Sequence, residues 1–208
     1  MQIYDISRTI APTTAVWEGD AAFRFDTVLS KEKGFAVNLT TIHLSPHTGT
    51  HADAPFHFAS DGQHPDQLPL EKYMGRAQVV SIDRKQGGIV PGDIADKLNI
   101  APVERILIHS WVSDVPDDQW VTDFPYPTVE LVDWLASQGA VLLGLDSPSV
   151  DEYTSKTLEC HHRLRSHGMV HLESLMLKNV PDGMYELIAL PLKMSGVCGS
   201  PVRAILRG

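Results

Sequence analysis

The sequence predicts one mixed α/β domain with a β-rich core, on the evidence of its length, its apolar content and its strand-like segments. Its 208 residues suffice for one domain with a full hydrophobic core and are somewhat few for two. Apolar residues make up 43% of the chain, as in ordinary globular proteins, which argues against disorder. Strand-like segments outnumber helical ones, and that balance indicates a mixed α/β class.

The predicted strands are apolar runs, several of them rich in valine and isoleucine and bounded by glycine, proline or aspartate. They cover residues 35–45, 77–82, 105–109, 140–145, 170–175, 186–192 and 202–206. Between the first two, residues 60–71 combine prolines and glycine with charged residues and are expected to form a surface loop.

The clearest predicted helix covers residues 129–138. Thr128 can cap its start, three apolar side chains share one face, and Gly139 can end it. A second helix is expected over residues 156–167, followed by Gly168, and a short one over residues 93–98. We see no internal repeat, so we expect a single domain over residues 1–208.

Charge and composition exclude several classes of partner. The 17 basic and 26 acidic residues give a net charge of −9, and an acidic surface repels nucleic acid. No apolar stretch approaches the roughly 18 residues of a membrane span, and no secretory signal is visible. The two cysteines, Cys160 and Cys198, form no CxxC motif and are interpreted as small buried residues of a reduced, cytoplasmic protein.

Histidine and aspartate are concentrated near residue 50, at His47, His51, Asp53 and His57. Imidazole and carboxylate groups are the usual ligands of zinc and similar divalent ions. A straight strand would spread this segment over about 33 Å, too far for one ion. The chain must therefore bend, and Gly49 is a natural bending point. We expect a strand end that turns into a loop and binds metal.

A second cluster contains His161, His162, His167, His171 and Glu173. His161 and His162 point to different sides of a helix, so we expect only one of them to face a site. His171 and Glu173 share one face of a predicted strand. A carboxylate in an apolar strand is costly unless it is paired or bound to a cation, which makes Glu173 the leading candidate ligand here.

The segment from His47 to Phe58 resembles the HxGTHxDxPxHF signature of the metal-dependent cyclase-like hydrolases, and every signature position matches. Residues 5–7 and 16–20 are similar to the DIS…WPGD pattern of that family, with Glu18 where proline is usual. Residues 145–151 are similar to its pocket segment. His161 and Glu173 match the spacing of its second ligand pair. The resemblance covers nearly the whole chain and is greatest to the bacterial kynurenine formamidases (arylformamidases).

This resemblance implies a swivelling β/β/α fold, a homodimer and two zinc ions per subunit, with manganese possible in their place. The implied metal ligands are His47, His51, Asp53, His161 and Glu173. Asp53 would bridge the two ions. The resemblance also implies that His57 is the acid–base residue and that Trp17 lines the pocket against an aryl ring, while Glu18 could alter the loop that carries Trp17.

The implied reaction is hydrolysis of N-formyl-L-kynurenine to L-kynurenine and formate in tryptophan degradation. One alternative is a hydrolase of the same family acting on a cyclic amide such as isatin or on another small acyl substrate. A second alternative is a non-catalytic metal-binding module, against which the spare histidine His57 argues.

Overall fold

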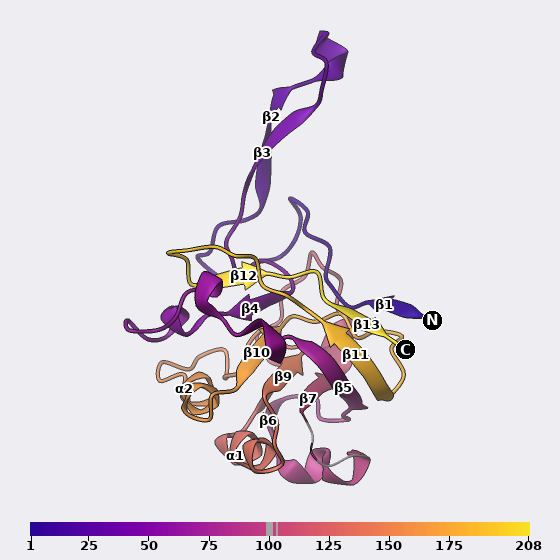
Figure 1. The fold of residues 1–208 in the computed structure, drawn as a ribbon, viewed down its shortest axis with the longest axis vertical. Coiled ribbons are helices and arrows are strands. Elements are labelled where there is room, and N and C mark those ends of the chain that lie inside the picture. The colour runs from indigo at the N-terminus through magenta and orange to yellow at the C-terminus, as the bar shows by residue number, and fades with distance from the viewer. Residues whose placement is uncertain (99–101, 103) are drawn as a thin grey trace.

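The computed structural model describes residues 1–98, 102 and 104–208, and its central feature is a curled nine-stranded sheet (Figure 1). In spatial order its strands are β1 (Ile3–Asp5), β13 (Ile205–Arg207), β11 (Gly183–Ile188), β5 (Met74–Ser81), β7 (Arg105–His109), β9 (Leu142–Leu145), β10 (Val170–Glu173), β4 (His51–Asp53) and β12 (Gly199–Pro201). Strands β5, β7, β9 and β10 are parallel, and the strands on both sides of them are antiparallel. The predicted mixed α/β class is confirmed.

The curl of the sheet follows from the short connection between two of its strands. β12 lies at one end of the strand order and β13 next to the other end, yet only residues 202–204 join them. Three extended residues span roughly 10 Å, so the two ends of the sheet must lie close together. The predicted strand over residues 202–206 is therefore wrong in part, because these residues cross between two strands instead of forming one.

Two apolar cores lie on the two sides of the sheet. Ile6, Tyr73 and Leu172 belong to the core enclosed by the curl. Helices α1 (Val129–Ser137) and α2 (Glu159–Ser166) contact each other and cover the second core (Figure 1). Helix α1 begins as predicted, because the Thr128 hydroxyl accepts a hydrogen bond from the Leu131 amide.

Helix α2 begins three residues later than predicted. The predicted range started at residue 156, but Leu158 has a left-handed backbone with φ 48°. The Asp151 carboxylate accepts hydrogen bonds from the amides of Cys160 and His161, and this distant contact fixes the start of the helix. The expected short helix over residues 93–98 is instead two 3-10 turns, η5 (Pro91–Asp93) and η6 (Ala95–Lys97).

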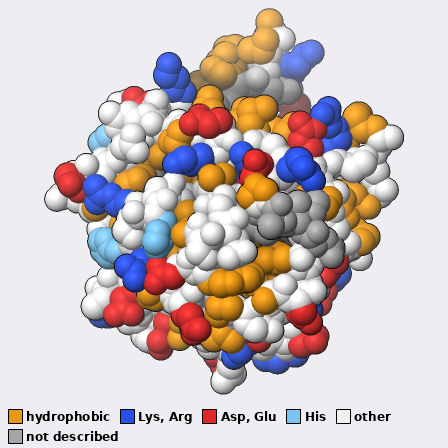
Figure 2. All heavy atoms as spheres, turned by 60° about the horizontal axis from the view of Figure 1, so that its bottom comes forward, with side chains coloured by type: hydrophobic (Ala, Val, Ile, Leu, Met, Phe, Trp, Pro, Cys, Tyr) orange, Lys and Arg blue, Asp and Glu red, His pale blue; other side chains and the backbone are white. Residues whose placement is uncertain are grey.

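A two-stranded arm projects from the body of the molecule (Figure 1). It consists of β2 (Arg24–Leu29), the turn η1 (Lys31–Lys33) and β3 (Leu39–His43). Its large apolar side chains are 48% to 58% exposed: Phe25, Val28, Phe35, Val37, Leu39 and Ile42. The predicted strand over residues 35–45 is thus present as β3 but lies in the arm, outside the core. The arm recedes at the top of Figure 2, where apolar side chains gather.

The remaining elements are short. Strands β6 (Gly87–Ile89) and β8 (Pro125–Pro127) pair in parallel. The other 3-10 turns are η2 (Pro55–His57), η3 (Pro65–Gln67), η4 (Leu70–Lys72) and η7 (Trp111–Asp114). Residues 60–71 contain no strand, in agreement with the predicted loop. Within the described part of the chain, no helix has the length and apolarity to cross a membrane. Acidic and basic side chains are interspersed on the face shown in Figure 2.

Candidate metal centre

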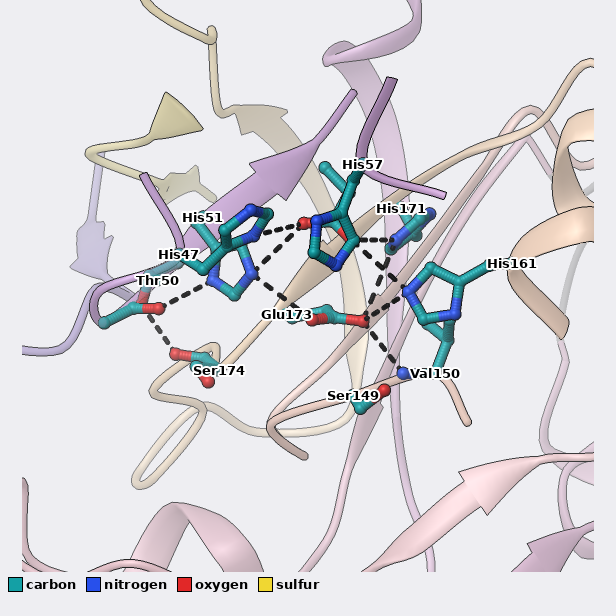
Figure 3. A network of polar contacts seen from close by, with 12 residues as sticks. His47, Thr50, His51, His57, Ser149, Val150, His161, His171, Glu173 and Ser174 are labelled. Atoms are coloured by element: carbon teal, nitrogen blue, oxygen red, sulfur yellow. Dashed lines mark hydrogen bonds and ion pairs between the residues drawn. The ribbon is translucent and has the colours of Figure 1, made fainter. Parts of the chain in front are cut away.

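Two neighbouring strands present the first candidate ligands. Strands β4 and β10 are antiparallel, and their register places Glu173 opposite His51. Since alternate residues of a strand share a face, His51 lies beside Asp53 and Glu173 beside His171. The His51 Nε2 atom lies 3.3 Å from Asp53 Oδ1 and 3.3 Å from Glu173 Oε2 (Figure 3).

Turns before and after β4 bring two further histidines to this pair of strands. Gly49 has φ +65°, and the chain bends there. The bend folds His47 back toward β4, so that its Nδ1 lies 2.9 Å from Asp53 Oδ1. On the other side, Pro55 begins η2 and carries His57 over the site. The His57 Nε2 atom is 3.9 Å from Asp53 Oδ2, and the side chain is 37% exposed. The predicted bend is present, and it leaves His57 the most open of these groups.

The second oxygen of Asp53 faces a deeper group of ligand atoms. Asp53 Oδ2 lies 3.3 Å from His161 Nε2 and 3.4 Å from His171 Nε2. Glu173 Oε1 lies 3.7 Å from each of the same two nitrogens. All four residues are buried. Asp53 therefore joins an outer set, formed with His47 and His51, to an inner set formed with His161, His171 and Glu173.

Hydrogen bonds on the far side of two rings direct their free nitrogens at the carboxylates. The His51 Nδ1–H donates to the Gly49 carbonyl at 2.9 Å, and His161 Nδ1 lies 2.6 Å from Asp151 Oδ2. Such outer partners are characteristic of histidines that bind metal through the other nitrogen. The Nε2 atom of His171 is buried without a hydrogen-bond partner. These donor atoms fit divalent ions that prefer imidazole and carboxylate ligands.

The charges of the site are strongly coupled. Burial alone would raise the pKa of Asp53, but the facing imidazoles of His161, His171 and other histidines hold that pKa well below its usual range. Burial would lower the pKa of His51, and the carboxylates of Asp53 and Glu173 instead raise it to about 10. The pKa of His161 is likewise raised to about 10, against burial, by Asp151 and Asp53. Positive charge is therefore favoured around Asp53.

A cavity of about 550 Å³ opens over the outer set. Its wall includes Trp17, Asp20, Trp120, Leu158 and Cys198 beside the histidines. The Trp17 ring lies 5.6 Å from the Trp120 ring and 4.7 Å from the Tyr153 ring, measured between centroids.

Glu18, which departs from the family pattern, receives a hydrogen bond of 3.3 Å from the Tyr153 hydroxyl. Because the Tyr153 ring packs against Trp17, this bond connects the loop that carries Trp17 to the segment that carries Tyr153.

The structure brings the seven candidate site residues of the sequence together at this cavity or directly beneath it. They are Trp17, His47, His51, Asp53, His57, His161 and Glu173. Two other histidines of the second cluster lie apart: His162 packs against Phe58, and His167 pairs with Asp133 on the surface.

Sequence reasoning did not assign His171, Asp151, Trp120 or Cys198 to the site. The signal for His171 was its shared strand face with Glu173. Cys198 was interpreted as a small buried residue, and nothing local to Trp120 or Cys198 in the sequence marks a cavity. Asp151 depends on a contact with α2 that only the folded chain reveals.

Fold and site together define a mixed α/β protein with a carboxylate-bridged candidate metal centre at the base of an aromatic cavity. The chain belongs to the Cyclase family, described as "Putative cyclase", whose family model matches residues 4–152. This match includes the outer set and His57. It ends before α2 and β10, which carry the histidines and the glutamate of the inner set.

Several solved structures share the fold over nearly the whole chain. One, described as a potential metal-dependent hydrolase with cyclase activity, is 26% identical, with 99% of this chain and 96% of that chain covered and a TM-score of 0.85. A predicted metal-dependent hydrolase from Bacillus stearothermophilus is 26% identical, with 99% and 97% covered and a TM-score of 0.83. Isatin hydrolase A from Labrenzia aggregata, bound to benzyl benzoate, is 25% identical, with 99% and 93% covered and a TM-score of 0.84.

Proposed function

We propose that this chain is a zinc-dependent amide hydrolase that converts N-formyl-L-kynurenine to L-kynurenine and formate. The observation that carries the proposal is the pair of ligand sets joined by Asp53, with the more open His57 beside them in an aromatic-walled cavity. Similarity to structures described as metal-dependent hydrolases supports it.

The two ligand sets differ in their number of ligands and in their exposure, and this difference suits separate roles for the inner and the outer ion. The inner set offers four buried side chains, Asp53, His161, His171 and Glu173, as many ligands as a closed zinc site uses. The outer set offers only three, and His47 is its most open member, with 17% of the side chain exposed against 5% or less for each inner ligand. Divalent ions held there would lower the pKa of a water molecule and draw charge from a carbonyl oxygen. We assign the reacting groups to the outer, more open side.

His57 is placed to move the proton that amide hydrolysis requires. Burial lowers the pKa of His57, so its imidazole is neutral at pH 7 and can accept a proton from the attacking water. The water oxygen forms a bond to the formyl carbon. The bond between that carbon and the aniline nitrogen then breaks, and His57 returns the proton to the nitrogen. Formate and the free aryl amine are the products.

The cavity wall offers a place for each end of this substrate. Trp17 and Trp120 present aromatic faces on which the aryl ring can stack. Asp20 also lines the cavity, and its carboxylate is suited to the α-ammonium group of an amino-acid substrate. This charge is the feature that favours formylkynurenine over a neutral aryl amide.

The test is a formate-release assay on N-formyl-L-kynurenine, combined with metal analysis of the purified protein. We expect bound zinc and turnover, and we expect D20N to raise KM for this substrate while metal content stays at the wild-type level. Protein that retains zinc but releases no formate would refute the substrate. Metal-loaded protein that is inactive on a panel of amides and esters would favour a non-catalytic module.

A cyclic aryl amide such as isatin is the second candidate substrate, because an isatin hydrolase is among the similar structures. Isatin carries no ammonium group, so the D20N substitution should leave its hydrolysis unchanged. Comparing the rates of wild type and D20N on the two substrates therefore discriminates between N-formyl-L-kynurenine and isatin as the substrate for which the cavity is suited.

We also propose that the protein is a homodimer in the cytoplasm. Isolated two-stranded ribbons are marginally stable in water, and the arm exposes six large apolar side chains. A permanent partner would cover them, and a second copy of the chain is the commonest such partner. Cys160 and Cys198 are both free thiols, which fits a reducing compartment.

A further inference from the structure

Cys198 lies directly behind one of the outer ligands. Its sulfur is 3.1 Å from His47 Nε2, on the side of the ring away from Asp53. The residue itself is held in place, because its carbonyl accepts a hydrogen bond of 3.0 Å from the Ala54 amide at the end of β4. The thiol therefore occupies the position that a carboxylate or carbonyl takes behind other metal-binding histidines.

The next residue, Gly199, supports the same ring from a second direction. It pairs with Asp53 at the start of β12. A Cβ atom added to Gly199 would lie 2.8 Å from His47 Cε1, closer than packed atoms tolerate, and a tight 3.2 Å from His47 Nδ1. Glycine is thus required for the His47 ring to lie against this strand. Cys198 and Gly199 together favour the orientation of the His47 imidazole in which Nδ1 is directed at Asp53.

We infer that Cys198 is a positioning residue for His47, an inference that rests on the metal centre of the proposed function. When Nε2–H donates to the Cys198 sulfur, Nδ1 carries no proton, is directed at Asp53 and is available to an ion in the outer set. The inference separates two roles open to this thiol. Cys198 could also ligate an ion with His47 and His57, whose donor atoms lie within 4.8 Å of its own. That role would use His47 Nε2 and remove His47 from the outer set.

The test is metal affinity, measured by chelator competition on the full chain. Loss of an outer partner typically weakens metal binding by about 10- to 100-fold. We expect C198A to lose this much affinity for one zinc equivalent and to leave the other unchanged, with C198S closer to wild type. G199A should weaken the same equivalent through displacement of the ring. C160A is the matched control for that equivalent, because the Cys160 thiol donates to the Pro127 carbonyl and lies beside Asp151, behind the inner set.

Cobalt loading distinguishes the two roles of the thiol. We expect Co²⁺ protein to lack the near-ultraviolet charge-transfer band of a cobalt–thiolate bond, and such a band, absent in C198A, would overturn the positioning role. Unchanged affinities in both C198A and G199A would overturn the inference and leave the metal centre intact. Wild-type protein that takes up no ion would overturn the metal centre and this inference with it.

Discussion

His51 and Glu173 occupy directly opposite positions in the antiparallel pair of β4 and β10, with His51 Nε2 3.3 Å from Glu173 Oε2. Strand register alone therefore brings together two candidate ligands that are 122 residues apart in the sequence. Both side chains are buried, and a buried charge is costly unless it is paired or bound to a cation. The pairing of β4 with β10 therefore also places these two side chains in the candidate metal centre.

The first prediction concerns His51. H51A removes the ligand that lies between Asp53 and Glu173, so metal and activity should be lost together. We expect the affinity to fall by more than the roughly 100-fold typical of losing an outer partner. Metal content after dialysis measures the effect. H43A is the control, because His43 lies in the arm and pairs with Asp26. Normal metal content in H51A would refute the assignment of this ligand.

The second prediction concerns His57. H57A should retain both ions and lose about 10²- to 10⁴-fold in kcat, the usual contribution of a general acid–base group. Metal analysis and initial rates on the same preparation separate the two effects. Should H57A lose an ion instead, His57 would be a ligand and its proton-transfer role would be wrong.

The pH profile gives a further prediction about His57. Burial lowers its pKa from 6.5, and the imidazole must be unprotonated to accept a proton from water. Activity should therefore persist below pH 6.5 and decline only as pH falls through the lowered pKa. Measurement of kcat/KM from pH 4.5 to 8 would locate this decline. An acid limb above pH 6.5 in the wild type would contradict the assignment.

A prediction about stability follows from the raised pKa values of His51 and His161, both about 10 in the folded chain against an ordinary value of 6.5 for histidine. A histidine that binds its proton more tightly in the folded state stabilises the fold. This contribution is fully present below pH 6.5 and is lost as pH rises through 10. Without bound metal, Tm should therefore fall between pH 6.5 and 10. Added zinc should raise Tm more at the upper end of this range, because protons compete with the ion.

Thermal unfolding at several pH values, with and without zinc, tests this expectation. H51Q is the matched variant, since it removes one of the two titrating rings and should flatten the decline without metal. A Tm without metal that is independent of pH across this range would contradict it.

The sequence carried different amounts of information about different parts of the molecule. The turn at Gly49, the helix capped by Thr128 and β7 follow from local residue preferences, and the structure contains all three. The start of α2 depends on Asp151, and the crossing over residues 202–204 depends on the curl of the sheet. Neither of these contacts is local, so no pattern in the sequence could reveal them.

The same distinction applies to the site. The outer set lies within one short segment, and its spacing was visible. His171 was visible only as a partner of Glu173 on one strand face, and the place of Cys198 behind His47 required the pairing of β12 with β4. The alternation of apolar residues in β3 predicted a strand correctly, but it could not show that the strand lies outside the core.

The last prediction concerns the arm. Phe25 and Ile42 lie directly opposite each other in the pair of β2 and β3, and both are at least half exposed. If a second copy covers them, I42K should weaken dimerisation. Burial of the exposed half of an isoleucine stabilises by about 1 kcal/mol, and a symmetric dimer contains the change twice, so we expect a loss of at least about 30-fold in affinity.

Light scattering after size exclusion at several concentrations would detect this shift toward monomer. L70K is the matched control, because Leu70 is 48% exposed on η4, away from the arm. Bound zinc per chain should be unchanged in I42K, since the arm contributes no ligand to either set. Wild-type protein that is monomeric at micromolar concentration would overturn the homodimer and leave the metal centre unaffected.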